Sequence, residues 1–286
     1  MYCPYTDEEL LPTETNCEHI IPLSLGGSNQ FTIGVNAKFN AEVGSKVDGV
    51  LANDFLILSR RIALDARGHT KKKPIAISKK STMGDQKSPV QVEFFSEDGL
   101  KVYDPIKRRN LTEEEVSGKT FTSSFTLHRF SRLRFAAKVA LATGYFVFGE
   151  WFRQNVAHDE LRTLMNLDSS PSPEDFEGFR IQVYDEFTQP SEADQQQFVM
   201  DEAFCRIVKG SCVYFVPGPV NLGVTVGVLG EYLATLNIPA KTDEFPFSDE
   251  NDLGHTVLLE NGQMERISYR QFARRVYDKL QLGTIG

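Results

Sequence analysis

The segment CEHIIPLSLGGSNQFTIGVNAKFN, residues 17–40, carries the clearest structural pattern in the chain. Residues 18–22 (EHIIP) favour a short strand that stops at Pro22, because proline cannot donate a hydrogen bond to a sheet. Residues 24–29 (SLGGSN) are typical of a loop, since glycines permit backbone angles that other residues avoid. Residues 31–35 (FTIGV) then favour a second strand. The segment therefore predicts two short strands joined by a glycine-containing loop.

A helix is predicted directly after the second strand. Asn36 belongs to the residue types that cap helix N-termini. Apolar residues then recur at helical spacing, namely Phe39, Val43, Val47 and Val50. The order strand, loop, strand, helix therefore occupies the first part of the chain.

Three side chains from these elements could act together on a phosphodiester. Glu18 and His19 are adjacent in the first strand, and Asn40 lies in the first turn of the helix. Phosphodiester hydrolysis needs an activated water and a group that stabilises charge on the phosphate. The Glu18 carboxylate and the Asn40 carbonyl oxygen suit a hard cation such as Mg²⁺. The His19 imidazole suits a general base for water near neutral pH.

Each of these residues also has a plain structural interpretation. A Glu-His pair taken alone is usually a surface accident, and an asparagine such as Asn40 can simply be a solvated helix residue. The remaining histidines have no partner at a recognisable spacing, and we interpret them as structural or surface residues; they are His69, His128, His158 and His255. The argument for chemistry therefore depends on several features that occur together.

The run from Cys3 to about Leu51 resembles the HNH endonucleases, also called ββα-metal nucleases. The resemblance is greatest to the subgroup that has a cysteine knuckle, Glu-His-Ile-Ile-Pro, Gly-Gly and then a Cys-x-x-Cys-Asn helix start. The matching residues are Cys3, EHIIP at 18–22, LGG at 25–27, VNAKFN at 35–40, Gly44 and Asp48. Several elements agree in order and spacing, and they cover about a sixth of the chain.

The resemblance implies a division of roles among the three side chains. Glu18 and Asn40 would bind one divalent ion, Mg²⁺ or Mn²⁺, and His19 would be the general base. A polar residue of the second strand usually orients the catalytic histidine in this family. Asn29, Thr32 and Asn36 are the candidates here, and Asn36 is also the expected helix cap.

The structural zinc of this subgroup is not expected in this chain. The two Cys-x-x-Cys pairs of the subgroup correspond here to Cys3 with Thr6 and to Asn36 with Phe39. A closed zinc site needs four ligands, and three of the expected cysteines are replaced. We expect apolar packing that involves Phe39 and Tyr5 to take the place of the metal.

The predicted boundaries divide the chain into three parts. Residues 1–58 form the HNH nuclease unit, residues 59–168 a basic and helical extension packed on it, and residues 169–286 an acidic mixed α/β C-terminal region. The stretch SSPSPED at 169–175 is the strongest linker candidate. The predicted fold class is therefore α+β, with an N-terminal ββα-metal unit followed by a mixed α/β C-terminal region.

Regular elements are also predicted beyond the motif. Residues 90–95 (VQVEFF) alternate as a strand does, and a long helix is predicted over about 128–155. Three further strand-like segments are FRIQVYDEF, SCVYFV and GVTVGVL. The Asn-Gly pair at 261–262 predicts a tight turn within a hairpin, and a closing helix is predicted over about 269–282.

Charge is distributed unevenly along the chain. The net charge is −8, which argues against a generally basic nucleic-acid binder. Between residues 59 and 138, however, Lys and Arg are about twice as numerous as Asp and Glu, whereas residues 151–286 show the reverse. A localised basic stretch is typical of a polyanion site, although ordinary solvated surface explains it about as well. The candidate phosphate-binding side chains are Arg67, Lys71, Lys72 and Lys73.

Composition indicates an ordinary globular protein of the reducing cytoplasm. The chain has 286 residues, of which 41% are hydrophobic and 24% charged, and this is enough to bury a core. Its four cysteines are too few for a disulfide scaffold, so we expect Cys205 and Cys212 to be free buried thiols. The start shows no secretion signal, and the longest apolar stretch, about 135–152, is too polar to span a membrane.

These features together predict a metal-dependent HNH endonuclease that hydrolyses phosphodiester bonds, with double-stranded DNA favoured as the substrate over RNA. The alternative is a catalytically inactive HNH-like module for nucleic-acid binding or assembly, which the lost zinc ligands favour. A protein partner or a homodimer is compatible with the acidic C-terminal part. Family occurrence alone suggests restriction or phage defence.

Overall fold

The protein divides into two compact units. The computed structural model describes residues 1–96, 99–125, 127–168, 171–246 and 253–281. Unit 1 comprises Met1–Ala52 and His128–Gly286, and unit 2 comprises Asn53–Leu127. Unit 1 is therefore built from two separate stretches of chain, and unit 2 is a single stretch between them.

A six-stranded antiparallel sheet forms the centre of unit 1, with the strand order β10-β13-β12-β11-β14-β15. The strands are β10 (Gln182–Asp185), β11 (Ser211–Pro217), β12 (Asn221–Val228), β13 (Glu231–Pro239), β14 (His255–Glu260) and β15 (Gln263–Ser268). The β14–β15 turn has positive φ at both Asn261 and Gly262, as an Asn-Gly hairpin turn requires.

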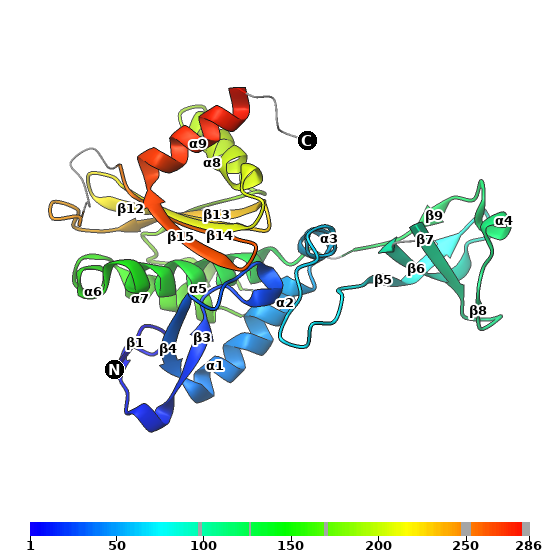
Figure 1. Ribbon diagram of the computed structural model, residues 1–286, viewed down its shortest axis with the longest axis horizontal. Coiled ribbons are helices and arrows are strands. Elements are labelled where there is room, and N and C mark those ends of the chain that lie inside the picture. The colour runs from blue at the N-terminus through cyan, green and yellow to red at the C-terminus, as the bar shows by residue number, and fades with distance from the viewer. Residues whose placement is uncertain (97–98, 126, 169–170, 247–252, 282–286) are drawn as a thin grey trace. The chain divides into compact units, whose positions relative to one another are not determined.

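Helices cover both faces of this sheet (Figure 1). The helices of this part are α5 (Arg129–Phe148), α6 (Glu150–Asn155), α7 (His158–Asn166), α8 (Gln195–Ile207) and α9 (Tyr269–Gln281), with the 3₁₀ turn η4 (Pro173–Phe176). α5 packs against β11, β12 and β13 on one face, while α8 and α9 lie on the other. Side chains of α5 from Phe135 to Gly144 are buried, because the helix is covered on several sides.

The N-terminal stretch adds a hairpin and a helix to unit 1. Its elements are β1 (Tyr2–Cys3), β2 (Glu8–Glu9), β3 (Thr15–His19), β4 (Thr32–Asn36), α1 (Ala37–Val43) and α2 (Gly49–Ala52), with the turns η1 (Pro12–Glu14) and η2 (Leu23–Leu25) and the π-helical turn η3 (Gly44–Asp48). β3 pairs with β4 in antiparallel fashion, and both α2 and η3 contact α5. The order strand, loop, strand, helix is therefore present as predicted.

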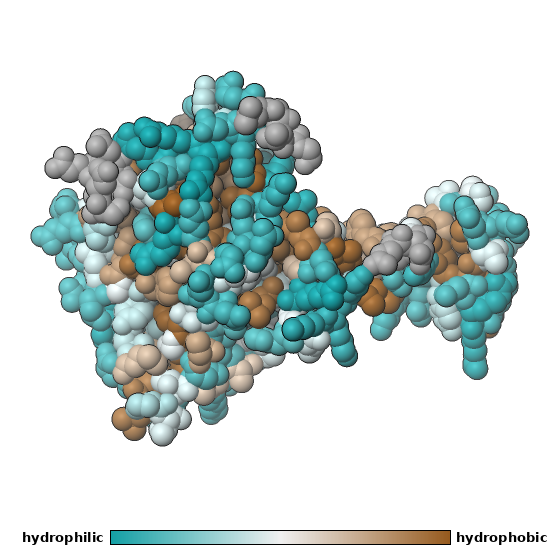
Figure 2. All heavy atoms as spheres, viewed as in Figure 1, coloured by the Kyte–Doolittle hydropathy of each residue, from teal (hydrophilic) through white to brown (hydrophobic). Residues whose placement is uncertain are grey.

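Unit 2 holds a five-stranded antiparallel sheet in the order β8-β7-β6-β5-β9. Its elements are α3 (Phe55–Ala63), β5 (Ala76–Met83), β6 (Ser88–Ser96), β7 (Gly99–Asp104), β8 (Arg109–Asn110), α4 (Glu113–Val116) and β9 (Phe121–Thr122). Its cluster of buried apolar residues is small and consists of Val90, Val92 and Val102. Apolar side chains also lie at its surface near α3, as Figure 2 shows.

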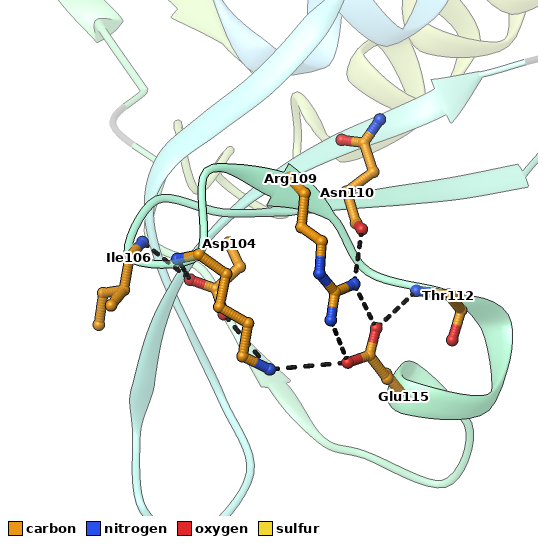
Figure 3. Close-up of polar contacts among 7 residues, drawn as sticks. Asp104, Ile106, Arg109, Asn110, Thr112 and Glu115 are labelled. Atoms are coloured by element: carbon orange, nitrogen blue, oxygen red, sulfur yellow. Dashed lines mark hydrogen bonds and ion pairs between the residues drawn. The ribbon is translucent and has the colours of Figure 1, made fainter.

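A charged cluster fixes the turn that precedes α4 in unit 2 (Figure 3). Arg109 donates two hydrogen bonds of 2.7 Å to the two carboxylate oxygens of Glu115. The backbone N–H of Thr112 donates to the same carboxylate. These hydrogen bonds lower the pKa of Glu115 to about 2, with Arg109 as the main cause. Because the pair is exposed, it orders the turn more than it stabilises the fold.

The predicted elements are largely present, with three differences in their limits. The strand expected over 18–22 lies at Thr15–His19, because Pro22 begins the turn η2 and accepts hydrogen bonds from Leu25 and Gly27. The long helix expected over about 128–155 is interrupted at Gly149, where φ is 55°. The closing helix is α9, whose predicted last residue, 282, lies outside the described residues.

The division into units also differs from the three predicted parts. The expected linker at 169–175 is not a unit boundary; residues 169–170 lie outside the described residues, and Pro173–Phe176 belongs to unit 1. The boundaries fall instead at Asn53 and at His128, because α5 packs on both the N-terminal hairpin and the large sheet. None of the described helices is long and apolar enough to cross a membrane.

Candidate active site

His19 ends β3 and faces a polar partner from the following loop. The pairing of β3 with β4 sets His19 opposite Thr32. The Nε2 atom of His19 lies 2.9 Å from Oδ1 of Asn29. Because an amide oxygen only accepts, Nε2 is the donor in this contact. Asn29 is therefore an expected supporting residue whose side chain contacts the histidine.

The Gly26-Gly27 pair lets the loop return close to the strand. Gly26 has a φ of 80°, in the left-handed region that favours glycine. A Cβ atom on Gly27 would lie 1.8 Å from the carbonyl oxygen of Ile21, which no side chain can tolerate. These two glycines therefore permit the tight path that brings Asn29 back to His19.

Asn36 and Asn40 have different roles at the start of α1. The side chain of Asn36 accepts hydrogen bonds from the backbone N–H groups of Lys38 and Phe39, which makes it the N-cap. The Nδ2 atom of Asn40 donates to Oδ1 of Asn16 at 3.2 Å. Oδ1 of Asn40 is buried and has no hydrogen-bond partner among the described residues. Asn36 therefore caps α1, whereas the amide oxygen of Asn40 stays unused in a buried position.

Glu18 points in a different direction from His19, as successive strand residues do. Its Oε1 atom accepts a hydrogen bond of 2.7 Å from Nζ of Lys138, on α5. The same ammonium donates to Oδ2 of Asp48 at 2.7 Å. The Lys138 side chain is completely buried, and those of Glu18 and Asp48 are only 14% and 11% exposed. One cation thus joins two carboxylates that come from β3 and η3.

Burial and charge act against each other in this cluster. Burial alone would lower the pKa of Lys138, but the nearby carboxylates of Asp48 and Glu18 outweigh it and raise that pKa above its usual value. Burial raises the pKa of Asp48 to about 6, although Lys138 opposes the shift. One ammonium cannot neutralise two buried carboxylates, so a proton held by Asp48 would leave the cluster without net charge.

The residues around Cys3, Tyr5 and Phe39 pack against one another. Cys3 is buried, and its sulfur accepts the backbone N–H of Asn36 at 3.4 Å. The rings of Tyr5 and Phe39 lie with their centroids 6.2 Å apart. A backbone contact and an aromatic pair therefore hold the β1–β2 turn against the start of α1.

The four candidate phosphate-binding residues lie in the loop between α3 and β5 of unit 2. Arg67 is already engaged, because it donates two hydrogen bonds of 2.7 Å to Asp65. Lys71, Lys72 and Lys73 are all exposed. The three lysine side chains therefore lie at the surface, and Arg67 would have to share its guanidinium with Asp65.

The donors around β3 can be tested for their fit to a divalent ion. The described residues contain no group of three or more His, Cys, Asp or Glu side chains that could hold a metal. The unused Oδ1 of Asn40 is nevertheless the kind of oxygen that a hard cation takes. Oε1 of Glu18 already accepts a hydrogen bond from Lys138, so Glu18 can share its carboxylate with an ion only in part. Asn40 and Glu18 are thus the members of the expected triplet whose oxygens are of the type that such an ion takes.

Sequence reasoning did not assign Lys138 to the site. Asp48 was noted within the HNH pattern, but without a role. The available signal was a lysine inside a long apolar stretch, since a buried lysine must find carboxylates. Glu18 also has no lysine or arginine near it in the sequence, which is a second indication that a distant cation pairs with it.

Comparison of the chain with protein-family models, with curated proteins and with solved structures finds no match. The assignment of a function therefore depends on the residues and contacts described above.

Proposed function

We propose that this chain is a metal-dependent endonuclease of the HNH kind, which hydrolyses phosphodiester bonds in nucleic acid and prefers DNA. The observation that carries the proposal is the contact between His19, at the end of β3, and Asn29, in the glycine loop. Its setting is a strand, loop, strand and helix in the order that the HNH resemblance implies.

In the proposed reaction the residues have separate tasks. Asn29 holds the His19 ring so that Nδ1 can take a proton from the attacking water. The Asn40 oxygen and the Glu18 carboxylate would hold a single Mg²⁺ or Mn²⁺, which supplies positive charge next to the phosphate. Lys138 acts behind this group and holds the Glu18 side chain in one position. The lysines at 71–73 would contact the phosphate backbone of the substrate.

One observation favours the alternative, a catalytically inactive HNH-like module that binds nucleic acid or assembles with a partner. Glu18, the only acidic ligand proposed, already forms an ion pair with Lys138. If that pair persists when nucleic acid binds, the metal would keep only the neutral oxygen of Asn40. Cleavage assays separate the two functions, because the module would bind nucleic acid without cutting it.

The test is cleavage of supercoiled plasmid with Mg²⁺ or Mn²⁺, with an EDTA control. The variants are His19→Ala and Asn40→Ala, and the matched control is His128→Ala, which changes an exposed histidine of unit 1. We expect His19→Ala to lower the rate by about 10²–10⁴-fold, which is the usual contribution of a general base. The control should cut at the wild-type rate.

Asn40→Ala should need more metal than the wild-type protein, because it removes one ligand oxygen. Asn40→His should keep some activity with Mn²⁺, which accepts imidazole. Metal-dependent cleavage that persists unchanged in His19→Ala would remove His19 from the mechanism. Binding without any cleavage by the wild-type protein would favour the inactive module.

A further inference from the structure

A cavity of about 480 Å³ lies in unit 1 between the large sheet and the helix α8, on the sheet face opposite to α5. Aromatic side chains from five elements form much of its wall, namely Tyr184, Phe198, Tyr214, Tyr232 and Tyr269. Its volume is within the range of small-molecule sites, which are typically about 300–1,000 Å³. The proposed nuclease mechanism makes no use of this cavity.

The sequence of β12 explains why the cavity exists. Alternate residues of a strand point to opposite faces. On the α5 face β12 carries large apolar residues, which are Leu222, Val224, Val226 and Val228, all completely buried. On the other face it carries Gly223, Thr225 and Gly227. The Cys205 and Cys212 side chains of the core fill the space over Gly227, whereas the amide oxygen of Asn237 lies 3.2 Å from where a Cβ atom on Gly223 would be.

Polar groups on the floor of the cavity are of two kinds. The carboxylate of Asp201 is already satisfied, because Gln197, Tyr214 and Thr235 all donate hydrogen bonds to it. Asn221 and Asn237, in contrast, are half-buried and make no side-chain hydrogen bond within the described part of the chain. Each therefore offers an amide donor and an amide acceptor to whatever occupies the cavity.

The charge of the lining restricts the ligand further. The charged residues of the lining are both acidic, Asp194 and Asp201, and no Lys, Arg or His occurs among the described residues that line the cavity. Such a site disfavours phosphate and carboxylate groups. Aromatic walls favour a flat ring that can stack, and carboxamides favour a ring edge with adjacent donors and acceptors.

We propose that this cavity binds a nucleobase, as an uncharged nucleoside or as a base within a nucleic-acid strand. The ring would stack on the half-buried rings of Tyr184 and Phe198, and its edge would form hydrogen bonds with Asn237 and Asn221. A base turned out of a strand would leave its phosphates outside the acidic interior. A free nucleotide would have to bring its phosphate much closer to Asp194, so it should bind less well.

Binding of adenosine, cytidine, guanosine and thymidine, each tested alone by isothermal titration calorimetry on the full chain, tests this site. We expect at least one nucleoside to bind, with an affinity in the micromolar to millimolar range usual for so small a ligand. Its 5′-monophosphate should bind at least about tenfold more weakly. Oligonucleotides with one unpaired base, compared with fully paired duplexes, distinguish a base in a strand from a free nucleoside.

Two variants and a matched control test whether the nucleoside binds in this cavity. Asn237→Ala should weaken binding by about tenfold, the usual effect of a lost hydrogen bond in a closed site. The control is Gln182→Ala, which removes an exposed amide from the residue opposite Asn237 in the β10–β13 pair. It should leave the affinity for the nucleoside unchanged. Gly223→Ile should block the floor, and circular dichroism checks its folding. If Gly223→Ile does not fold, the affinity of Asn237→Ala for the nucleoside is the deciding measurement.

The proposal is overturned if no nucleoside and no unpaired-base oligonucleotide binds, or if Asn237→Ala binds as the wild-type protein does. Tighter binding of the monophosphate would equally overturn an uncharged ligand. The variant His19→Ala should bind the nucleoside normally, so loss of nuclease activity and loss of this site can be told apart.

Discussion

At the scale of single residues, Lys138 connects the N-terminal hairpin to the rest of unit 1. Its ammonium is completely buried and donates to carboxylates from β3 and η3 at 2.7 Å. A buried ion pair adds little net stability, because desolvation costs about as much as the attraction returns. Removal of one partner is different, since it leaves a buried charge without compensation. Lys138 therefore specifies where the hairpin sits more than it strengthens the fold.

This reasoning predicts that Lys138→Met destabilises the protein by about 3–5 kcal/mol at neutral pH. The control is Lys209→Met, an exposed lysine of unit 1, which should change stability by less than about 0.5 kcal/mol. Urea unfolding followed by the fluorescence of Trp151, the single tryptophan of unit 1, measures both. Equal stability of the two variants would contradict the buried ion pair.

Asp48 makes stability depend on pH in a specific direction. Its pKa is raised from 3.8 to about 6 in the folded protein, mainly by burial. The folded state therefore binds a proton more tightly than the unfolded chain between about pH 4 and about pH 6. The contribution of Asp48 to the free energy of unfolding is consequently greatest below about pH 4 and falls as pH rises through about 6.

Asp48→Asn should remove this contribution, because an amide cannot ionise. Urea unfolding of both proteins at several pH values measures the difference. The variant should gain stability relative to wild type as pH rises from about 4 to about 7. A difference that does not change with pH would show that Asp48 keeps an ordinary pKa in the folded protein.

Sequence patterns identified some of these residues better than others. The helix cap Asn36 follows from a local rule, because its partners lie within three residues. Asn29 was one of three candidates for the partner of His19, and the residues alone did not choose among them. The partner of Glu18 could not be found in this way, since Lys138 is 120 positions later in the chain. Which distant cation meets a carboxylate depends on tertiary packing, and periodicity carries no information about it.

At the scale of elements, strands and helices with strong periodicity were predictable, and irregular ones were less so. The β14–β15 hairpin has its turn at Asn261 and Gly262, as the dipeptide predicts. The strand expected over 18–22 ends early, because the chain turns at Pro22 to let the glycine loop return. The basic loop before β5 has no regular structure, and only its composition indicated a function.

That loop gives an element-scale prediction. Replacement of Lys71, Lys72 and Lys73 together by Ala should weaken nucleic-acid binding and flatten its dependence on salt. Each lost phosphate contact should reduce the slope of log K against log salt by about 0.9 for duplex DNA. Fluorescence anisotropy with a labelled duplex at several salt concentrations measures the slope.

The matched control for the triple variant is Lys79→Ala with Lys80→Ala, which changes two exposed lysines of the adjacent strand β5. It should leave the slope nearer to the wild-type value. Identical slopes for the wild-type protein and the triple variant would make residues 71–73 ordinary surface.

At the scale of the whole molecule, the two units should differ in stability. Unit 2 has three buried apolar side chains in its core cluster, whereas the sheet of unit 1 is buried between helices on both faces. Stability in proteins is not uniform, and regions with few buried apolar contacts open more easily. Unit 2 should therefore open while unit 1 remains folded.

Hydrogen exchange followed by mass spectrometry tests this expectation. Amides of β5, β6 and β7 should exchange faster than those of β11, β12 and β13, by more than the difference in their intrinsic rates. Exchange of both sets at one common rate would mean that the chain unfolds as a single cooperative body.

The split construction of unit 1 has a consequence for the order of events during synthesis. Residues 1–52 are made first, but the helix that supplies Lys138 follows only after all of unit 2. A ribosome adds about 5–20 residues per second, so several seconds separate Asp48 from its counter-ion. Throughout that interval the β3–β4 hairpin lacks the helix against which it packs. The candidate active site is therefore completed late, after the neighbouring unit has had time to fold.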